Sequence, residues 1–221
     1  MTFSIVGRDP KTGQLGVAIS TAVPNVGGRC PYAKENVGAV SSQARSNPYL
    51  AIYALQLIEN GYNSETALAQ VLEWDSGRDN RQVHLVSLNG DTAAYTGKDT
   101  IPWSGHKTGM NFSAAGNRLV GPETIDAMAE SFVANLDLLL PDKLMAALEA
   151  GQNAGGDKQG RVSAALLVMG DEAYPFVRLQ VDESSDPVAD LRRIYEIQRP
   201  HMLTPRLQIS RTVMDGHPQI E

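Results

Sequence analysis

Thr2 is the residue whose type and position offer the simplest chemistry. An initiator methionine that precedes a residue as small as threonine is usually removed, and Thr2 would then carry a free α-amine beside its own hydroxyl. An α-amine has a pKa of about 7.7–8.0, so a good fraction is neutral near physiological pH and can act as general base for that hydroxyl. Such a pair can attack an amide carbonyl without a cofactor. The simpler interpretation is that threonine is common at position 2 and favours strands.

The other reactive side chains form no recognisable site in the sequence. The four histidines stand far apart, with no carboxylate or cysteine at ligand spacing, which argues against a metal centre. Cys30 lies in no nucleophile signature, and a buried or idle thiol is the favoured interpretation. The phosphate-binding, zinc-peptidase, nucleophile-elbow and CxxC motifs are all missing from the sequence. We therefore expect neither a metal nor a cofactor.

Composition narrows the class of protein. The chain has 221 residues with 19 Lys+Arg against 25 Asp+Glu, a net charge of −6, and 42% hydrophobic residues. This suits one globular domain and argues against a nucleic-acid partner, because phosphate contacts need clustered Lys and Arg. A single cysteine fits a reducing compartment. No apolar run is long enough to span a bilayer, and the start lacks a secretion signal. We expect a cytoplasmic protein with no membrane partner.

The elements that must position Thr2 can be read from apolar periodicity and turn signals. Antiparallel strands occur in blocks with helices between them, which indicates an α+β fold in one compact domain. Residues 21–36 and 97–110 are rich in Gly, Pro and Asn and are predicted as loops. The expected strands are 2–7, 15–20, 37–42, 82–88, 92–96, 112–115, 162–169 and 176–181. The expected helices are 48–60, one capped by Asn63-Ser64, one opened by Pro122, 141–150, and one from Asp186-Pro187.

Several segments together resemble known proteins. TFSIVGRDPKTGQLGVAIST resembles the start of the N-terminal-nucleophile hydrolases, which include proteasome-type β subunits, and VGAVSSQARSNPYLAIYALQLI resembles the segment that lines their substrate pocket. More closely, GRDPKTG, SGRDNRQ, IPWSGHKTG, AAGN and GGDKQGRVSAALL resemble, in order over roughly residues 2–195, the family known as domain of unknown function 1028. The resemblance implies a four-layer αββα sandwich with mostly antiparallel sheets.

The resemblance also assigns catalytic roles to individual residues. Thr2 falls on the nucleophile position, and Asn117, after Gly116, falls where a turn supplies an oxyanion-hole donor. Asp157 and Ser163 fall near the Asp and Ser that orient the terminal amine in the proteasome-like branch. These residues are the catalytic candidates.

The substrate-binding candidates are Ser20, Gln43 and Arg45. Ser20 replaces an Asp that the proteasome-like branch carries at the end of its second strand, and the catalytic Lys of that branch has only Arg29 and Lys34 in its neighbourhood. Gln43 and Arg45 follow the third strand, where the resemblance implies a pocket wall. Arg45 can hold a substrate carboxylate by a bidentate contact, although a surface Arg paired with an acid is an equal alternative.

The sequence therefore leaves three hypotheses. The leading one is an amidohydrolase that uses Thr2 on a small-molecule amide. The second is a catalytically silent chain of the same fold that binds a small ligand or a protein. The third is a subunit of a homo-oligomeric assembly. We expect one domain over residues 1–195 and an extension over 196–221 that packs on a neighbouring subunit, so a homo-oligomer is expected.

Overall fold

The computed structural model describes residues 2–203 and contains two antiparallel sheets. The larger sheet has six strands, and the first strand of the chain lies near its middle, hydrogen-bonded on both sides. The strands of this sheet are, in order across it, β10 (Pro175–Val181), β9 (Ser163–Met169), β2 (Leu15–Thr21), β1 (Thr2–Arg8), β8 (Phe112–Asn117) and β7 (Gly105–Gly109).

The smaller sheet faces the larger one and has four strands, each paired with its neighbour along the chain. Its last hairpin turns at Asn89-Gly90, where Gly90 has φ +88, a conformation that residues with a Cβ rarely adopt. The strands are, in order, β3 (Pro31–Lys34), β4 (Gly38–Ala44), β5 (Arg81–Ser87) and β6 (Thr92–Thr96).

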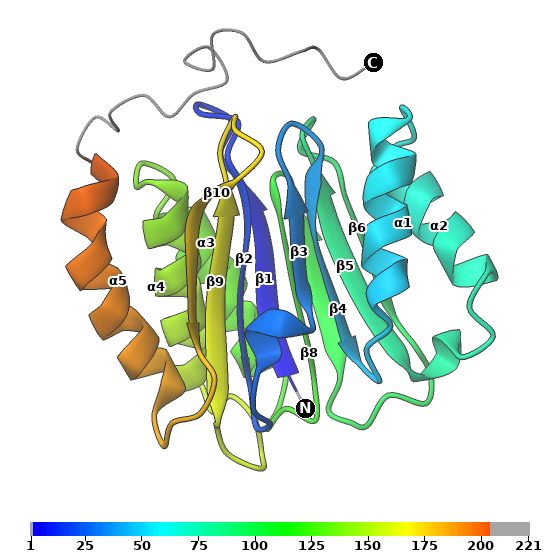
Figure 1. The fold of residues 1–221 in the computed structure, drawn as a ribbon. Coiled ribbons are helices and arrows are strands. Elements are labelled where there is room, and N and C mark those ends of the chain that lie inside the picture. Colours follow the sequence, from blue (N-terminus) through cyan, green and yellow to red (C-terminus); the bar gives the residue numbers. More distant parts are fainter. Residues whose placement is uncertain (1, 204–221) are drawn as a thin grey trace, which may run out of the picture.

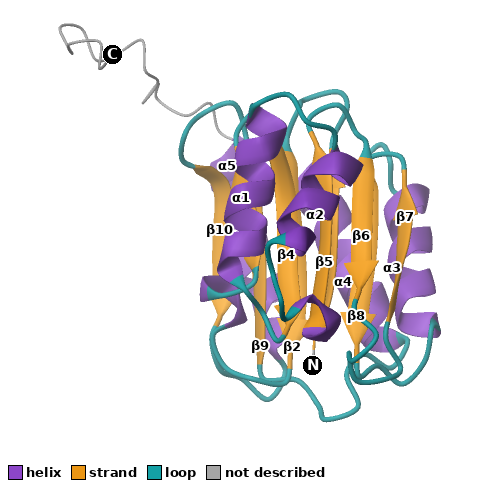
Figure 2. Cartoon of the chain, turned by 90° about the vertical axis from the view of Figure 1, so that its right-hand side faces the viewer, coloured by secondary structure: helices purple, strands orange, loops and turns teal. Residues whose placement is uncertain are grey.

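Helices cover the outer face of each sheet, so the molecule is a four-layer αββα sandwich (Figures 1 and 2). The predicted α+β fold and its four layers are confirmed. The helices over the smaller sheet are α1 (Pro48–Glu59) and α2 (Ser64–Glu73), and those over the larger sheet are α3 (Glu123–Ala134), α4 (Leu140–Asn153) and α5 (Pro187–Leu203).

The helices begin where local chemistry favours a start. Asn47 caps α1 by accepting the backbone N–H of Tyr49, and Pro48 follows at the first helical position. Asn63 caps α2 by accepting the N–H of Thr66. Each cap satisfies a backbone donor that the helix itself leaves unpaired.

Strand β1 is buried on both faces, which holds the start of the chain in place. Phe3 and Ile5 point toward the helical layer and pack with Met128 and Phe132 of α3. Burying a side chain of this size stabilises the fold by roughly 1.5–3 kcal/mol. The alternate residues of β1 face the smaller sheet. The first residues of the described chain are therefore part of the core.

A buried ion pair anchors the turn between β1 and β2. Lys143 of α4 places its Nζ 3.1 Å from Oδ2 of Asp9, and the two side chains are 1% and 5% exposed. Burial alone would raise the pKa of the Asp9 carboxyl, but the hydrogen bond from the Lys11 amide and the Lys143 ammonium lower it below its ordinary value. The pair therefore fixes the β1–β2 hairpin to α4.

Two strands occur inside segments predicted as loops. β3 follows a short 3-10 helix, η1 (Val26–Gly28), within 21–36, and β7 lies within 97–110. Both are edge strands of four or five residues, and β7 is mostly exposed, so neither carries the apolar alternation that identifies a strand.

The last helix crosses the expected domain boundary. Helix α5 continues without a break past residue 195, through Pro200 to Leu203. The remainder of the expected extension, residues 204–221, lies outside the described residues.

Candidate functional site

The ends of several strands meet around Thr2. In the register of the larger sheet Thr2 lies opposite Thr21 on one side and Asn117 on the other, and Thr21 lies opposite Ser163. Paired residues in neighbouring strands point to the same face, so all four side chains face the smaller sheet. Figure 1 shows this end of the sandwich at the bottom, where the chain begins. The fold brings together three of the predicted catalytic residues, Thr2, Asn117 and Ser163.

The hydroxyl beside Thr2 belongs to Thr21. The two Oγ1 atoms lie 3.2 Å apart, and Thr2 is 5% exposed. Ser20, the predicted neighbour, points to the opposite face, because it pairs with Phe3, whose ring packs against the helices. The Ser20 hydroxyl is buried there without a hydrogen-bond partner among residues 2–203. The structure therefore does not bring Ser20 to Thr2.

Asn117 is held by a glutamine of the opposite sheet. Its Nδ2 donates to Oε1 of Gln82 over 3.0 Å, and Asn117 is buried. Gln82 in turn donates through Nε2 to the carbonyl oxygen of Gly116 over 2.8 Å and to Oγ1 of Thr96 over 2.9 Å. An amide nitrogen carries two protons, so Asn117 keeps a second Nδ2 proton beyond the one that it donates to Gln82.

A layer of polar side chains between the sheets extends from this point into the core. Ser4 donates to Oε1 of Gln43 over 2.6 Å and lies 2.7 Å from Nε2 of His84, while Gln43 donates to Gln82 over 2.8 Å. All of these side chains are fully buried. We call this set the inter-sheet polar cluster; its members are Ser4, Ser41, Gln43, Gln82, His84 and Ser113.

Two members of the inter-sheet polar cluster, Gln43 and His84, are inaccessible to a substrate because they are fully buried. Gln43, a predicted substrate-binding residue, is 0% exposed. Its amide accepts from Ser4 and donates to Gln82 and to the carbonyl of Ala115, so its hydrogen bonds are made within the core. Burial, with a smaller contribution from His106, lowers the pKa of His84 to about 3. His84 is therefore neutral at physiological pH.

The sequence contains a signal for this cluster. Polar residues alternate with apolar ones on β5, as Gln82, Val83, His84 and Leu85, whereas β4 carries the unbroken polar run Ser41-Ser42-Gln43. Such alternation normally indicates a strand with one face in water. Here the second sheet covers that face.

Asp157 carries an unused buried carboxylate oxygen. Its Oδ1 accepts the Gln159 amide over 2.9 Å, whereas Oδ2 has no hydrogen-bond partner among the described residues. Burial raises the pKa of the Asp157 carboxyl, against the hydrogen bond from the Gln159 amide and the influence of the nearby Ala22 amide, which both lower it. Ala22 follows Thr21, the strand partner of Thr2, so the Asp157 carboxylate lies near the start of β1.

Ser163 is engaged with the loop after β2. Its hydroxyl donates to the carbonyl of Val23 over 2.6 Å and accepts the amide of Val26 over 3.1 Å. The single hydroxyl proton is therefore committed to that loop. In the described structure Ser163 positions the chain beside Thr21.

A cavity of about 220 Å³ opens at the same end of the sandwich. It is lined by Asn117 and by the predicted substrate-binding residue Arg45, which is exposed and directly follows β4. We call it the Asn117 cavity. Residues lining it include Ala44, Arg45, Asp99, Thr100, Asn117 and Arg118.

The two basic residues considered in place of a catalytic lysine lie elsewhere. Lys34 pairs with Gly38 at the far end of the smaller sheet from Ala44, and its Nζ binds Glu59 over 2.6 Å. Arg29 is exposed after η1. Neither lines the Asn117 cavity.

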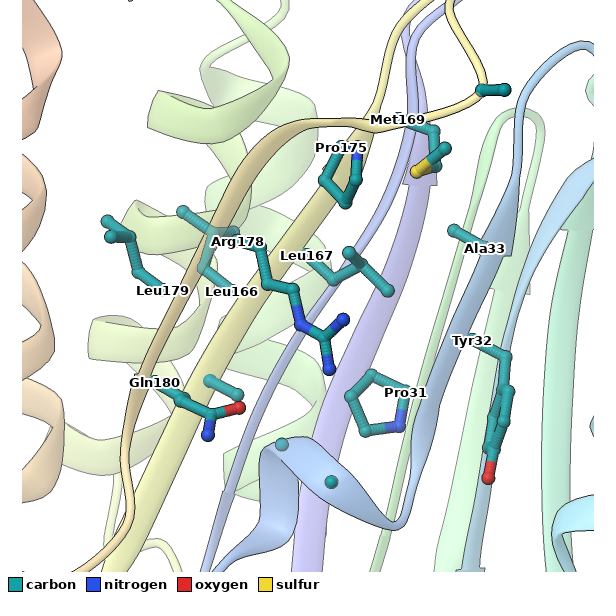
Figure 3. Close-up of a pocket in the computed structure, with 14 residues that line it drawn as sticks. Pro31, Tyr32, Ala33, Leu166, Leu167, Met169, Pro175, Arg178, Leu179 and Gln180 are labelled. Atoms are coloured by element: carbon teal, nitrogen blue, oxygen red, sulfur yellow. The ribbon is translucent and has the colours of Figure 1, made fainter.

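A second hollow, of about 320 Å³, lies on the inner face of the larger sheet where the smaller sheet does not cover it. Figure 3 shows Arg178 of β10 reaching across its floor between Leu167 and Pro31. Neither Thr2 nor Asn117 lines it.

Within residues 2–203 no group of three or more His, Cys, Asp or Glu side chains is placed to hold a metal ion. Over the same residues, no helix combines the length and apolar character needed to cross a bilayer.

Comparisons with known proteins place the chain. A search of curated proteins returned no match. The crystal structure of protein SPO2555 from Silicibacter pomeroyi, assigned to DUF1028, superimposes with a TM-score of 0.83 at 35% identity, over 89% of this chain and 88% of that one. Anbu (ancestral beta-subunit) from Yersinia bercovieri gives a TM-score of 0.44 at 8% identity over 94% and 99% of the two chains, a similarity too low to support inference. Residues 2–191 match the model of the Family of unknown function (DUF1028), and the chain belongs to that family.

Proposed function

We propose that this protein is an amidohydrolase whose nucleophile is the Thr2 hydroxyl and whose general base is the α-amine of Thr2 after removal of Met1. The Oγ1 atom attacks the carbonyl carbon of an amide while its proton passes to the amine. The protonated amine then gives that proton to the leaving nitrogen as the C–N bond breaks. Water hydrolyses the acyl-ester on Thr2 and releases the acid.

One observation carries the proposal. Thr2 is the first residue of a central strand that is paired on both sides, and its strand partner Asn117 lines a cavity. A strand held this way fixes the nucleophile without further ordering, because hydroxyl and amine belong to one residue. The start of a chain is usually its least ordered part, and here it is core.

Asp157 and Asn117 fit supporting roles. The buried Oδ2 of Asp157 lacks a partner in the described structure, and an ammonium at the start of β1 would stabilise its ionised form. The second Nδ2 proton of Asn117 is free to stabilise the negative charge that develops on the attacked carbonyl oxygen. The hydrogen bond to Gln82 holds the Asn117 amide in place.

The size of the cavity favours a small substrate. Pockets for drug-sized ligands are roughly 300–1,000 Å³, and the Asn117 cavity is smaller, at about 220 Å³. A small-molecule amide fits better than a folded protein or a long peptide.

The experiment is a hydrolysis screen with protein shown by intact mass to begin at Thr2. A panel of small amides is incubated with this protein, with Thr2→Ala, and with Thr108→Ala, which changes an exposed threonine on β7. The Thr2→Ala change is expected to reduce turnover by ~1,000-fold or more, because nucleophile loss is among the largest single effects in catalysis. Thr108→Ala is expected to retain full activity.

The screen tests the nucleophile and the general base separately. Full activity in Thr2→Ala refutes the proposed nucleophile. Equal activity in protein that retains Met1 refutes the role of the free amine, because the blocked residue has none.

A further inference from the structure

The Asn117 cavity carries charges of both signs. Two arginines, Arg45 and Arg118, and one acidic residue, Asp99, line it. The remaining polar groups include Thr100 and Asn117, and the latter borders Thr2 in the sheet. A ligand in this cavity therefore meets cationic and anionic groups together.

None of these three charged groups forms a salt bridge within residues 2–203, although Asp99 interacts electrostatically with Lys98 and Arg118 with Asp157. Salt bridges connect other pairs of acids and bases, such as Arg81 with Asp75 at 2.8 Å, but none includes Arg45, Asp99 or Arg118. The Arg118 guanidinium lies 3.5 Å from Oε1 of Gln159, and its charge favours the ionised form of Asp157. Charged groups that line a cavity and form no salt bridge can pair with a ligand.

The backbone around the cavity supports a built site. Ala44 has φ +69 and Arg118 has φ +55, a left-handed conformation that is uncommon for residues with a Cβ. Arg118 is fixed on both sides, since its N–H donates to the Ile101 carbonyl over 2.9 Å and its own carbonyl accepts the Lys158 amide over 3.3 Å. The strained turn directs the chain after Asn117 around the cavity and keeps it there.

We propose that the Asn117 cavity binds the zwitterionic head of an amino-acid amide, with the carboxylate on Arg45 and Arg118 and the ammonium on Asp99. This assignment rests on the proposed function, and it names the substrate class of the same site. Planar guanidinium groups suit a carboxylate, which accepts hydrogen bonds in the same plane. Two bases and one acid give the lining a net charge of +1, which suits a molecule with one positive and one or two negative charges. The amide is then presented to Thr2 from the Asn117 side.

The test separates binding from turnover. L-Glutamine and L-asparagine carry an amide, a carboxylate and an ammonium at two spacings, and each is titrated by calorimetry into the Thr2→Ala protein, which cannot turn them over. Glutaramate and succinamate, which lack the ammonium, are the matched probes. We expect at least one amino acid to bind the Thr2→Ala protein.

Variants made in the Thr2→Ala background test which cavity residues bind the ligand carboxylate and which bind its ammonium. Arg45→Gln and Arg118→Asn are each expected to raise Kd about tenfold or more, the size expected for one lost charge-assisted hydrogen bond. Asparagine suits φ +55, so the second change adds no backbone strain. Asp99→Asn is expected to raise Kd about tenfold for the amino acid and to leave the Kd of the ammonium-free probe unchanged.

A matched control is available at the second hollow. Arg178→Gln removes an exposed guanidinium outside the Asn117 cavity and is expected to leave Kd unchanged. Absence of binding by both amino acids overturns the substrate class, and so does equal affinity in the Arg45 and Arg118 variants.

Failure of the substrate class and failure of the proposed function give different results. Hydrolysis of an uncharged amide by the Thr2 protein, with no amino-acid binding, overturns the substrate class and leaves the nucleophile in place. Binding that depends on Arg45 and Arg118, with no turnover of any amide by the Thr2 protein, supports the ligand class and overturns the hydrolase.

Discussion

The neutral His84 in the inter-sheet polar cluster makes stability depend on pH. Its side chain is fully buried, with Nε2 2.7 Å from Ser4 and Nδ1 3.2 Å from Ser113, and its pKa is lowered from 6.5 to about 3. Below pH 6.5 the imidazole of His84 binds a proton in the unfolded chain but remains neutral in the folded chain. The stability from this group is therefore complete above pH 6.5 and falls as the pH decreases. At pH 5 the loss is about 2 kcal/mol, from ~1.36 kcal/mol for each of ~1.5 pH units.

The measurement is urea denaturation of the wild type and His84→Gln between pH 7 and pH 5. Glutamine keeps a donor and an acceptor in the site but does not titrate in this range. The wild type is expected to lose about 2 kcal/mol more than the variant over the interval. The pKa values of Asp9, Asp75 and Asp91 are lowered from 3.8, so their contribution to acid lability begins below this window. An identical dependence on pH in both proteins would refute the burial of a neutral imidazole.

Three further outcomes are expected. Gln82→Met leaves the buried amide donors of Asn117 and Gln43 unpaired, so urea denaturation should show a loss of ~2–6 kcal/mol; a loss below 1 kcal/mol would contradict the hydrogen bonds described. Lys143→Met leaves Asp9 charged and buried and should lower the free energy of unfolding by ~3–5 kcal/mol. Adding Asp9→Asn should recover part of that loss, and purely additive effects in the double variant would contradict the coupling of the two residues. Burial raises the pKa of the Cys30 thiol to about 11, so iodoacetamide at pH 8 should label the native protein far more slowly than the unfolded one; equal rates would show an accessible thiol.

Much of the fold follows from local patterns in the sequence. Helices α1 and α2 were predictable because Asn47, Pro48 and Asn63 mark their starts, and the β5–β6 hairpin because Asn89-Gly90 marks its turn. The edge strands β3 and β7 were not, because their ladder partners rather than their own residues make them strands. Strand pairing of this kind depends on tertiary contacts that composition does not encode.

The sequence likewise predicts some residues of the candidate site and misses others. The place of Thr2 beside Asn117 agrees with the resemblance, but the identity of its neighbour does not follow from sequence, because one residue along a strand reverses the face. Thr21 therefore occupies the side expected for Ser20. Gln82 and His84 were missed because their alternation is typical of a solvent-facing strand, and only the second sheet turns that face into core.

The most direct test of the central claim is to trap the acyl-enzyme on protein that begins at Thr2. An electrophilic amide is added, and the adduct is located by peptide mapping and mass spectrometry. The account predicts one acyl group on the peptide that starts at Thr2, and none in Thr2→Ala or in protein that retains Met1. An adduct on another residue, or equal labelling with Met1 in place, would contradict it.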